Sequence, residues 1–176
     1  MTTIIILTIL IILTIIITRG YDLNNKLSFY KLRIDKAEKE IEEELDNRYE
    51  IVKEIQKTIE KSTKMELKIY KDLDELKEKQ TISTIEYDKL LNELVEMIYL
   101  IQNDYPKINK KKDFKETISK LNNSNTTIVA SKSFYNENNN QLIELLKKFP
   151  TNIIGKFRNM KIKPNYEIIN KIEDDY

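Results

Sequence analysis

The first 18 residues of the chain, MTTIIILTILIILTIIIT, contain no charged side chain. As a helix that rises about 1.5 Å per residue, they would extend roughly 27 Å, which is enough to cross the hydrocarbon core of a bilayer. Thr8 and Thr14 do not prevent insertion, because a threonine hydroxyl in a helix can bond to a backbone carbonyl one turn earlier. The sequence therefore predicts a single transmembrane anchor over residues 1–20, which contacts the lipid bilayer through residues 1–18.

A cleaved signal peptide and a buried β-strand are two other interpretations of this run. A signal peptide carries basic residues before its apolar stretch and small residues at its cleavage site. Here nothing basic precedes Ile4, and the run ends in Ile17, Thr18 and Arg19. A buried strand would be much shorter, since about 4–8 residues is usual. We therefore favour a retained membrane anchor.

Basic side chains follow the apolar run closely, whereas only the α-amino group precedes it. They are Arg19, Lys26, Lys31 and Arg33. Lysine and arginine beside a membrane span are retained on the cytoplasmic side. The sequence thus predicts a single-pass protein of the cell membrane whose folded part faces the cytoplasm.

Residues that end helices or form tight turns are rare in this chain, with two glycines and three prolines among 176 residues. All-β and α/β folds need more of them, so long helices are expected. The chain also has no histidine and no cysteine. Their absence removes the commonest general base, the thiolate nucleophile and the usual zinc ligands. Gly20 and Gly155 stand alone, so the chain has no glycine-rich loop for binding phosphates.

Apolar residues recur every three or four positions after the anchor, which is the spacing of a buried helix face. The stripe consists of Leu27, Tyr30, Ile34, Ala37, Ile41, Leu45, Val52, Ile55 and Ile59, with a longer gap at Arg48. It loosens over residues 62–64 and resumes at Met65, Ile69, Leu73 and Leu76. One long helix and two helices both fit residues 27–80, because neither glycine nor proline forces a break.

A capping-box sequence from Ser83 to Glu86 predicts the start of another helix. Its apolar face consists of Tyr87, Leu90, Leu91, Leu94, Ile98 and Ile101. This helix should end before Pro106, because proline disfavours helical geometry in the residue before it. Asp113 is the predicted cap of the last long helix.

Within that last helix, apolar residues follow at intervals of seven, at Phe114, Leu121, Ile128, Tyr135, Leu142 and Phe149. Ile118 and Leu146 occupy the adjoining seam positions at the two ends, while Asn125, Lys132 and Asn139 occupy them in the middle. Polar residues on a seam usually control register or mark an edge open to water. A groove for a partner or small ligand is the alternative.

Stripes of this kind must be buried against neighbouring helices. The predicted fold class is all-α: an N-terminal single transmembrane helix followed by an antiparallel bundle of three or four long helices. The predicted divisions are the anchor at 1–20, a helical bundle at 21–152, and a basic and apolar C-terminal tail at 153–176.

Several short motifs match the pattern of a known family. They are Ile128, the pair Tyr135 and Asn136, the block Phe149 to Ile154 (FPTNII), Tyr105 and Pro106 followed by Phe114, and Ile41, Leu45, Arg48 and Val52 in the first helix. Through these residues nearly the whole chain resembles the LemA family of bacterial membrane-anchored helical proteins. The family-motif positions considered as candidate sites are Tyr105, Pro106, Phe114, Ile128, Tyr135, Asn136, Phe149 and Pro150.

The chain departs from the family at Leu142 and Ile143, which stand where a second Tyr-Asn pair is typical. If the Tyr-Asn pairs form a functional surface, half of it is missing here. The resemblance implies a membrane-tethered helical bundle. It implies no known reaction, cofactor or substrate.

The tail mixes basic and apolar side chains without an acidic residue between Ile153 and Lys163. Such a mixture can lie on an anionic membrane surface, and an even number of antiparallel helices would return it to the bilayer. A tail packed back on the bundle is the alternative. The predicted membrane-surface contacts are Lys156, Phe157, Arg158, Lys161 and Lys163.

The chain's charge is balanced, with 30 basic and 29 acidic residues, so no bulk field recruits nucleic acid. Glu42 to Glu44 point about 100° apart on a helix and do not converge on a metal. We therefore expect no enzymatic activity, no bound metal and no cofactor.

The predicted function is that of a structural or adaptor protein acting through protein partners, self-association or membrane contacts. The alternative is a regulatory or sensing subunit of a membrane protease or sensor kinase.

Overall fold

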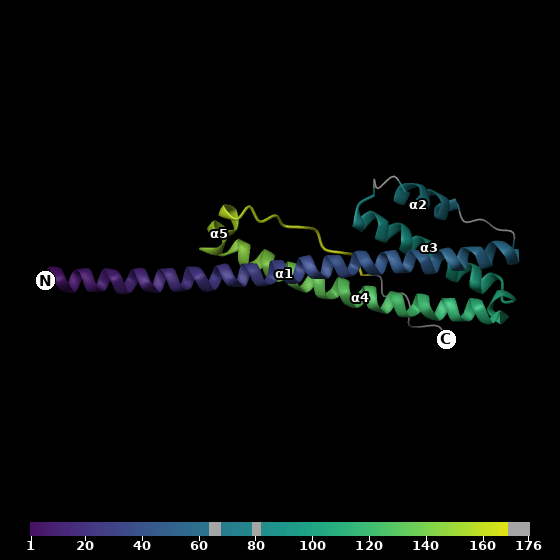
Figure 1. The fold of residues 1–176 in the computed structure, drawn as a ribbon, viewed down its shortest axis with the longest axis horizontal. Helices are drawn as coiled ribbons and strands as arrows, with labels where there is room; N and C mark the ends of the chain where they lie inside the picture. The colour runs from purple at the N-terminus through teal and green to yellow at the C-terminus, as the bar shows by residue number, and fades with distance from the viewer. Residues whose placement is uncertain (64–67, 79–81, 169–176) are drawn as a thin grey trace. The chain divides into compact units, whose positions relative to one another are not determined.

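The structure, a computed structural model, describes residues 1–63, 68–78 and 82–168, which are helical over most of their length (Figure 1). Its elements are α1 (Thr2–Thr63), α2 (Lys68–Glu78), α3 (Thr84–Asp104), the 3₁₀ turn η1 (Ile108–Lys110), α4 (Lys112–Lys147) and α5 (Thr151–Phe157). Throughout these ranges there is no strand. The predicted all-α fold class is confirmed, including an N-terminal helix that is long and apolar enough to cross a membrane.

The apolar run forms the first turns of α1, and every one of residues 1–18 is exposed. As expected for threonines in a membrane span, the Thr8 hydroxyl donates to the Ile4 carbonyl over 2.8 Å, and Thr14 donates to Leu10 over 2.8 Å. These bonds leave neither hydroxyl bare in an apolar surrounding. Within the described residues, α1 is the one candidate membrane span.

Contacts divide the chain into two compact units. Unit 1 combines Met1–Glu38 with Ser133–Asn165, and unit 2 combines Lys39–Lys132 with Tyr166 and the residues after it. Each unit thus draws on segments far apart in the sequence, whereas the predicted divisions at 1–20, 21–152 and 153–176 are consecutive. Those divisions stay a prediction.

The predicted stripes form the core of unit 2. Fully or almost fully buried in it are Ile41, Leu45, Val52, Ile55 and Ile59 from α1, Leu91, Leu94 and Ile98 from α3, and Phe114, Leu121 and Ile128 from α4. α1 is described up to Thr63 and α2 from Lys68; the junction on which the choice between one helix and two over residues 27–80 depends, residues 64–67, lies outside the described residues. Met65 and the side chain of Ile69 lie outside the described residues, and Leu73 is buried.

The two predicted boundaries of α3 are confirmed. The Ser83 hydroxyl accepts the Glu86 N–H over 3.3 Å at its start, and α3 ends at Asp104, before Pro106. The predicted cap of α4 is wrong: α4 begins at Lys112, so Asp113 lies inside its first turn. The Lys111 carbonyl already accepts the Lys115 N–H over 3.2 Å. A carboxylate in the first turn still favours the helix dipole.

The row of residues at intervals of seven is buried from Phe114 to Leu142, but Phe149 does not belong to it. α4 ends at Lys147, and 79% of Phe149 is exposed. Pro150 accounts for the difference, because proline lacks the N–H that a continuing helix would use and disfavours helical geometry in Phe149.

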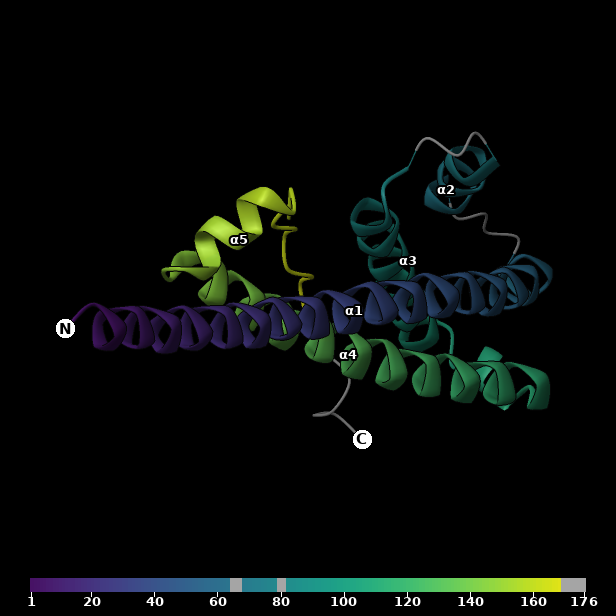
Figure 2. The ribbon, with the colours of Figure 1, turned by 60° about the vertical axis from the view of Figure 1, so that its left-hand side comes forward.

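Unit 1 is built from α1 up to Glu38, the part of α4 from Ser133, and α5. Its buried side chains include Leu27, Ile34 and Ala37 on α1, and Tyr135 and Leu142 on α4. Figure 2 shows α5 beside the part of α1 that belongs to this unit. The residues after α5, 158–165, are called the C-terminal segment below.

Candidate functional site

α5 folds back closely onto the end of α4. The Thr151 hydroxyl donates to the Lys148 carbonyl over 2.7 Å and also to the Leu145 carbonyl. Gly155 is buried, and a Cβ added to it would overlap Leu146 Cδ2. A larger residue at this position would therefore require the Leu146 side chain to shift.

Arg158 ties the end of α5 to α1. Its Nη1 donates to Ser28 Oγ over 2.8 Å, to Asn24 Oδ1 over 3.0 Å and to the Asn24 carbonyl over 3.3 Å. Along a helix, Asn24 lies about 9 Å beyond Thr18. This contact holds α5 close to the end of the candidate span.

The start of α5 also lies beside the part of α1 that follows the apolar run. A hollow of about 440 Å³ is lined by Arg19, Asp22, Leu23, Asn25, Lys26 and Pro150. All of these except Pro150 come from the two turns of α1 that follow the apolar run. Both ends of α5 therefore meet the part of α1 that directly follows the candidate span.

Three large apolar side chains around α5 are exposed. Phe157 is 88% exposed, Phe149 79% and Ile153 44%. Three lysines in the same stretch, Lys147, Lys148 and Lys156, are also exposed. We call this group of six residues the α5 surface, which combines apolar and basic character.

The C-terminal segment is held against α4 through its backbone. Asn139, which is buried, donates from Nδ2 to the Lys163 carbonyl over 2.9 Å and to Asn165 Oδ1 over 2.7 Å. The Tyr135 hydroxyl donates to the Pro164 carbonyl over 3.3 Å. Lys163 also pairs with Glu38 on α1.

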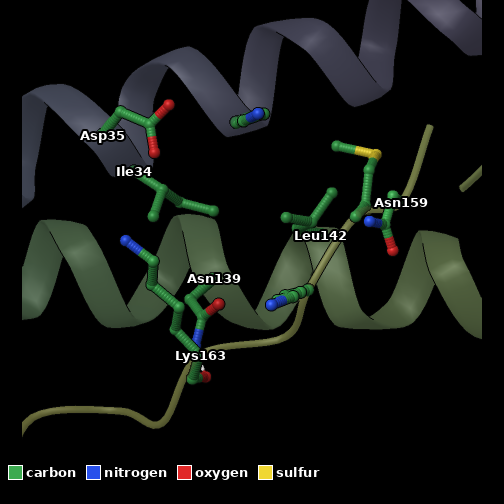
Figure 3. A pocket seen from close by; sticks show the side chains of 9 residues that line it. Ile34, Asp35, Asn139, Leu142, Asn159 and Lys163 are labelled. Atoms are coloured by element: carbon green, nitrogen blue, oxygen red, sulfur yellow. Dashed lines mark hydrogen bonds between the residues drawn. The ribbon is translucent and has the colours of Figure 1, made fainter.

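A pocket of about 320 Å³ lies between α1, α4 and the C-terminal segment of unit 1. Figure 3 shows Ile34 and Asp35 on α1 facing Asn139 and Leu142 on α4. The other lining residues are Lys31, Asn159, Met160, Lys161 and Lys163. The lining carries three ammonium groups and one carboxylate, so its charge is positive.

Tyr135 of α4 is a buried titratable residue in unit 1, and its hydroxyl contacts the C-terminal segment. Burial, together with the nearby carboxylates of Glu38 and Asp35, raises the pKa of its hydroxyl to about 12. The hydroxyl is therefore a proton donor at neutral pH. It serves to hold the C-terminal segment.

Unit 2 contains a buried cluster of charged groups, formed by Arg48 of α1, Asp88 of α3 and Lys132 of α4. Lys132 Nζ lies 2.6 Å from Asp88 Oδ2, and Arg48 Nη1 lies 3.9 Å from Asp88 Oδ1. Arg48 Nη1 also donates to Asn92 Oδ1 over 2.8 Å. Each of the three helices thus contributes one charged group.

Burial lowers the pKa of both Lys132 and Arg48, while the carboxylate of Asp88 opposes this by raising it. Arg48 Nε and Asp88 Oδ1 have no hydrogen-bond partner among the described residues. Two cations against one carboxylate make Asp88 the group on which the cluster depends. The polar seam positions Asn125, Lys132 and Asn139 are all buried rather than open to water.

A group of tyrosines joins α1, α2 and α3 in unit 2. The Tyr49 hydroxyl donates to Asp74, and the ring of Tyr49 stacks on Tyr70 with 6.0 Å between the centroids. Tyr87 donates to Asp46 over 3.5 Å. Burial is the main cause that raises the pKa of Tyr49 and of Tyr87, with carboxylates nearby adding to it.

The family-motif positions do not form one site. Phe114, Ile128 and Tyr135 are buried, whereas Tyr105 and Pro106 are exposed in the turn after α3. Asn136 is half-buried on α4, and Phe149 and Pro150 precede α5. The positions fall in both units, and the three buried ones, Phe114, Ile128 and Tyr135, belong to the helix packing.

The predicted membrane-surface contacts have three different positions within unit 1. Phe157 and Lys156 belong to the exposed α5 surface. Arg158 and Lys163 instead bind groups on α1, and Lys161 lines the 320 Å³ pocket.

Asp88 and Asn24 were not identified from the sequence. Asp88 directly follows Tyr87 on an apolar face, and the gap at Arg48 and the lysine at position 132 are the sequence signals that could have pointed to a buried carboxylate. No sequence signal pointed to Asn24. In the described parts of the chain, no three His, Cys, Asp or Glu side chains come together to hold a metal ion.

Comparison with known families matches residues 37–175 to the LemA family. This range includes α1 from Ala37 onward, all of α2 to α5 and the C-terminal segment. A comparison with curated proteins finds no match for the chain.

Proposed function

Because the chain belongs to the LemA family, we propose that it is a membrane-anchored structural or adaptor protein that acts through protein and membrane contacts rather than catalysis. One observation carries this proposal: α1 is unbroken from Thr2 to Thr63. The same helix provides an exposed apolar run at residues 1–18 and buried core residues such as Leu27 and Ile34. The anchor and the folded body are parts of one element.

The composition and the buried polar groups support action by contact. The chain has no histidine or cysteine. The charged groups in its interior, Arg48, Asp88 and Lys132, bind one another and lie below the surface. Groups enclosed in this way stabilise a bundle and are not accessible to a substrate.

Exposed apolar side chains support protein partners. On α3, Leu100 is 63% exposed and Met97 is 38% exposed, and they lie three residues apart on one face. Contiguous exposed apolar side chains mark protein contacts, and this pair is the start of such a patch on α3. The basic residues from Arg19 to Arg33, which follow the apolar run, favour an orientation in which the folded part of the chain faces the cytoplasm.

Photo-crosslinking in cells tests the adaptor proposal. A photoreactive amino acid is placed at Leu100 in the full chain, with Lys120, an exposed residue of α4, as the matched control position. We expect discrete crosslinked protein species from position 100 and few from position 120. Absence of crosslinks at position 100, at a normal level of the protein in membranes, would overturn the adaptor proposal.

The identity of the crosslinked species distinguishes two forms of the function. A second copy of the chain, or several different proteins, supports the structural role. A single membrane protease or sensor kinase in stoichiometric amount would replace it with the regulatory-subunit alternative.

A further inference from the structure

We propose that the α5 surface is a second membrane contact, which inserts Phe149, Ile153 and Phe157 among the headgroups of the bilayer that holds residues 1–18. This inference rests on the proposed anchoring. It adds a peripheral contact that is distant in sequence from the span, and it identifies the lipid surface as the ligand of α5.

Position relative to the span is the first argument. Pro150 lines the hollow with Arg19 and Lys26, and Arg158 binds Asn24 and Ser28. Measured along α1, Asn24 and Ser28 lie about 9 and 15 Å beyond Thr18. The headgroup layer is roughly 5–8 Å thick on each side, and interfacial helices sit about 5–10 Å deep at its boundary. α5 is therefore held within side-chain reach of this layer.

Exposure of the apolar side chains is the second argument. Phe157 is 88% exposed and Phe149 is 79% exposed. Ile153 is four residues before Phe157, so these two side chains share a face of α5. Aromatic rings are favoured at the membrane interface. Contact with lipid would remove all three side chains from water.

Charge is the third argument, and it favours a bilayer over a protein as the occupant. No acidic residue occurs between Leu145 and Tyr166. Lys148 and Lys156 flank the apolar side chains, and Arg19 and Lys26 face the same layer from α1, against the single carboxylate of Asp22. This excess of positive charge complements anionic headgroups.

The hydrogen bonds of Arg158 assign it a positioning role. Its guanidinium binds Asn24 and Ser28, so it holds α5 at the level of the bilayer. Lys163 likewise pairs with Glu38. The lipid contact thus belongs to residues 147–157 more than to the basic residues that follow them.

Fluorescence quenching by lipids tests the proposal. Because the chain has no cysteine, single variants Ile153→Cys, Leu32→Cys and Leu10→Cys can each carry one environment-sensitive fluorophore. The labelled full chain is reconstituted into vesicles of phosphatidylcholine and phosphatidylglycerol that contain lipids with a quencher in the upper acyl chain. Leu32 is the matched control, since it is 70% exposed in the same unit but lies about 21 Å beyond Thr18.

We expect several-fold stronger quenching at position 153 than at position 32, together with strong quenching at position 10. Equal, weak quenching at positions 153 and 32 with strong quenching at position 10 would overturn the α5 contact and leave the anchor intact. Weak quenching at position 10 would instead refute the proposed anchoring and the α5 contact with it.

A second variant tests the apolar side chains directly. Phe157→Glu should reduce quenching at position 153 several-fold, whereas Leu32→Glu should leave it unchanged. Both side chains are exposed, so neither change should alter helicity measured by circular dichroism. Unchanged quenching in the Phe157→Glu variant would contradict insertion of this side chain.

Discussion

Lys132 Nζ lies 2.6 Å from Asp88 Oδ2, and both side chains are almost completely buried. Because Arg48 approaches the other oxygen of the same carboxylate, at 3.9 Å, Asp88 is shared by two buried cations. The pair joins α3 to α4, and Arg48 adds α1. A charged layer in an apolar interior fixes which residues of the helices lie opposite one another.

Removing Asp88 should therefore destabilise the chain strongly. In Asp88→Ala, Arg48 and Lys132 remain buried without the carboxylate that they share, which costs about 3–5 kcal/mol of unfolding free energy. Urea or thermal unfolding in detergent, followed by circular dichroism, measures the change. In Lys132→Met the Arg48–Asp88 pair remains, so we expect less than half of that loss. Equal losses in the two variants would contradict the central role of Asp88.

Stability should fall at alkaline pH because of Tyr135. The folded pKa of its hydroxyl is raised to about 12, above that of an unfolded tyrosine. The unfolded chain thus loses this proton first as pH rises above about 10, and the stability contributed by Tyr135 disappears as pH approaches the folded pKa. Tyr135→Phe should flatten, but not abolish, the dependence of unfolding free energy on pH, since Tyr49 and Tyr87 shift in the same direction. An unchanged pH profile would count against the burial of this hydroxyl.

Asn139 should control the attachment of the C-terminal segment. Asn139→Ala removes the two bonds to Lys163 and Asn165, at a cost of about 1–3 kcal/mol for the buried groups left unpaired. Hydrogen exchange in residues 158–165 should rise by at least tenfold. The exposed neighbour Glu137→Ala is the control and should leave exchange unchanged. Similar exchange in the two variants would show that the segment is held by other contacts.

Changes at Ser83, the N-cap of α3, should have a smaller effect on the unfolding free energy. Ser83→Ala removes the acceptor of the Glu86 N–H and should cost about 1 kcal/mol, whereas Ser83→Asp keeps an acceptor and should preserve stability. Chemical unfolding of both variants measures this. Loss of stability in the aspartate variant as well would contradict a capping role.

The helical core could be predicted because burial on a helix repeats in the sequence. Leu27, Ile41 and Ile59 follow one stripe, and each is fully buried. Ser83 and Pro106 mark local boundaries that depend on only a few neighbouring residues. Such features need no knowledge of the tertiary fold.

The buried charges and the C-terminal segment depend on tertiary contacts and were harder to predict. Asp88 has the same local surroundings as an exposed aspartate until Arg48 and Lys132 are placed beside it. The C-terminal segment is held largely through the Lys163 and Pro164 carbonyls, which carry no side-chain signature. Phe149 was predicted to be buried because it continues the row of apolar residues at intervals of seven. That prediction failed because α4 ends at Lys147, two residues before Phe149.

Alkaline extraction of membranes tests most directly whether the chain is anchored through residues 1–18. Membranes from bacteria that produce the full chain are washed with sodium carbonate, in parallel with a Leu7→Lys, Ile11→Lys variant, in which each lysine opposes insertion by about 2.5–3.5 kcal/mol. Our account predicts that the unaltered chain stays in the membrane pellet and that the variant appears in the wash. Release of the unaltered chain by carbonate, or retention of the variant, would contradict the account.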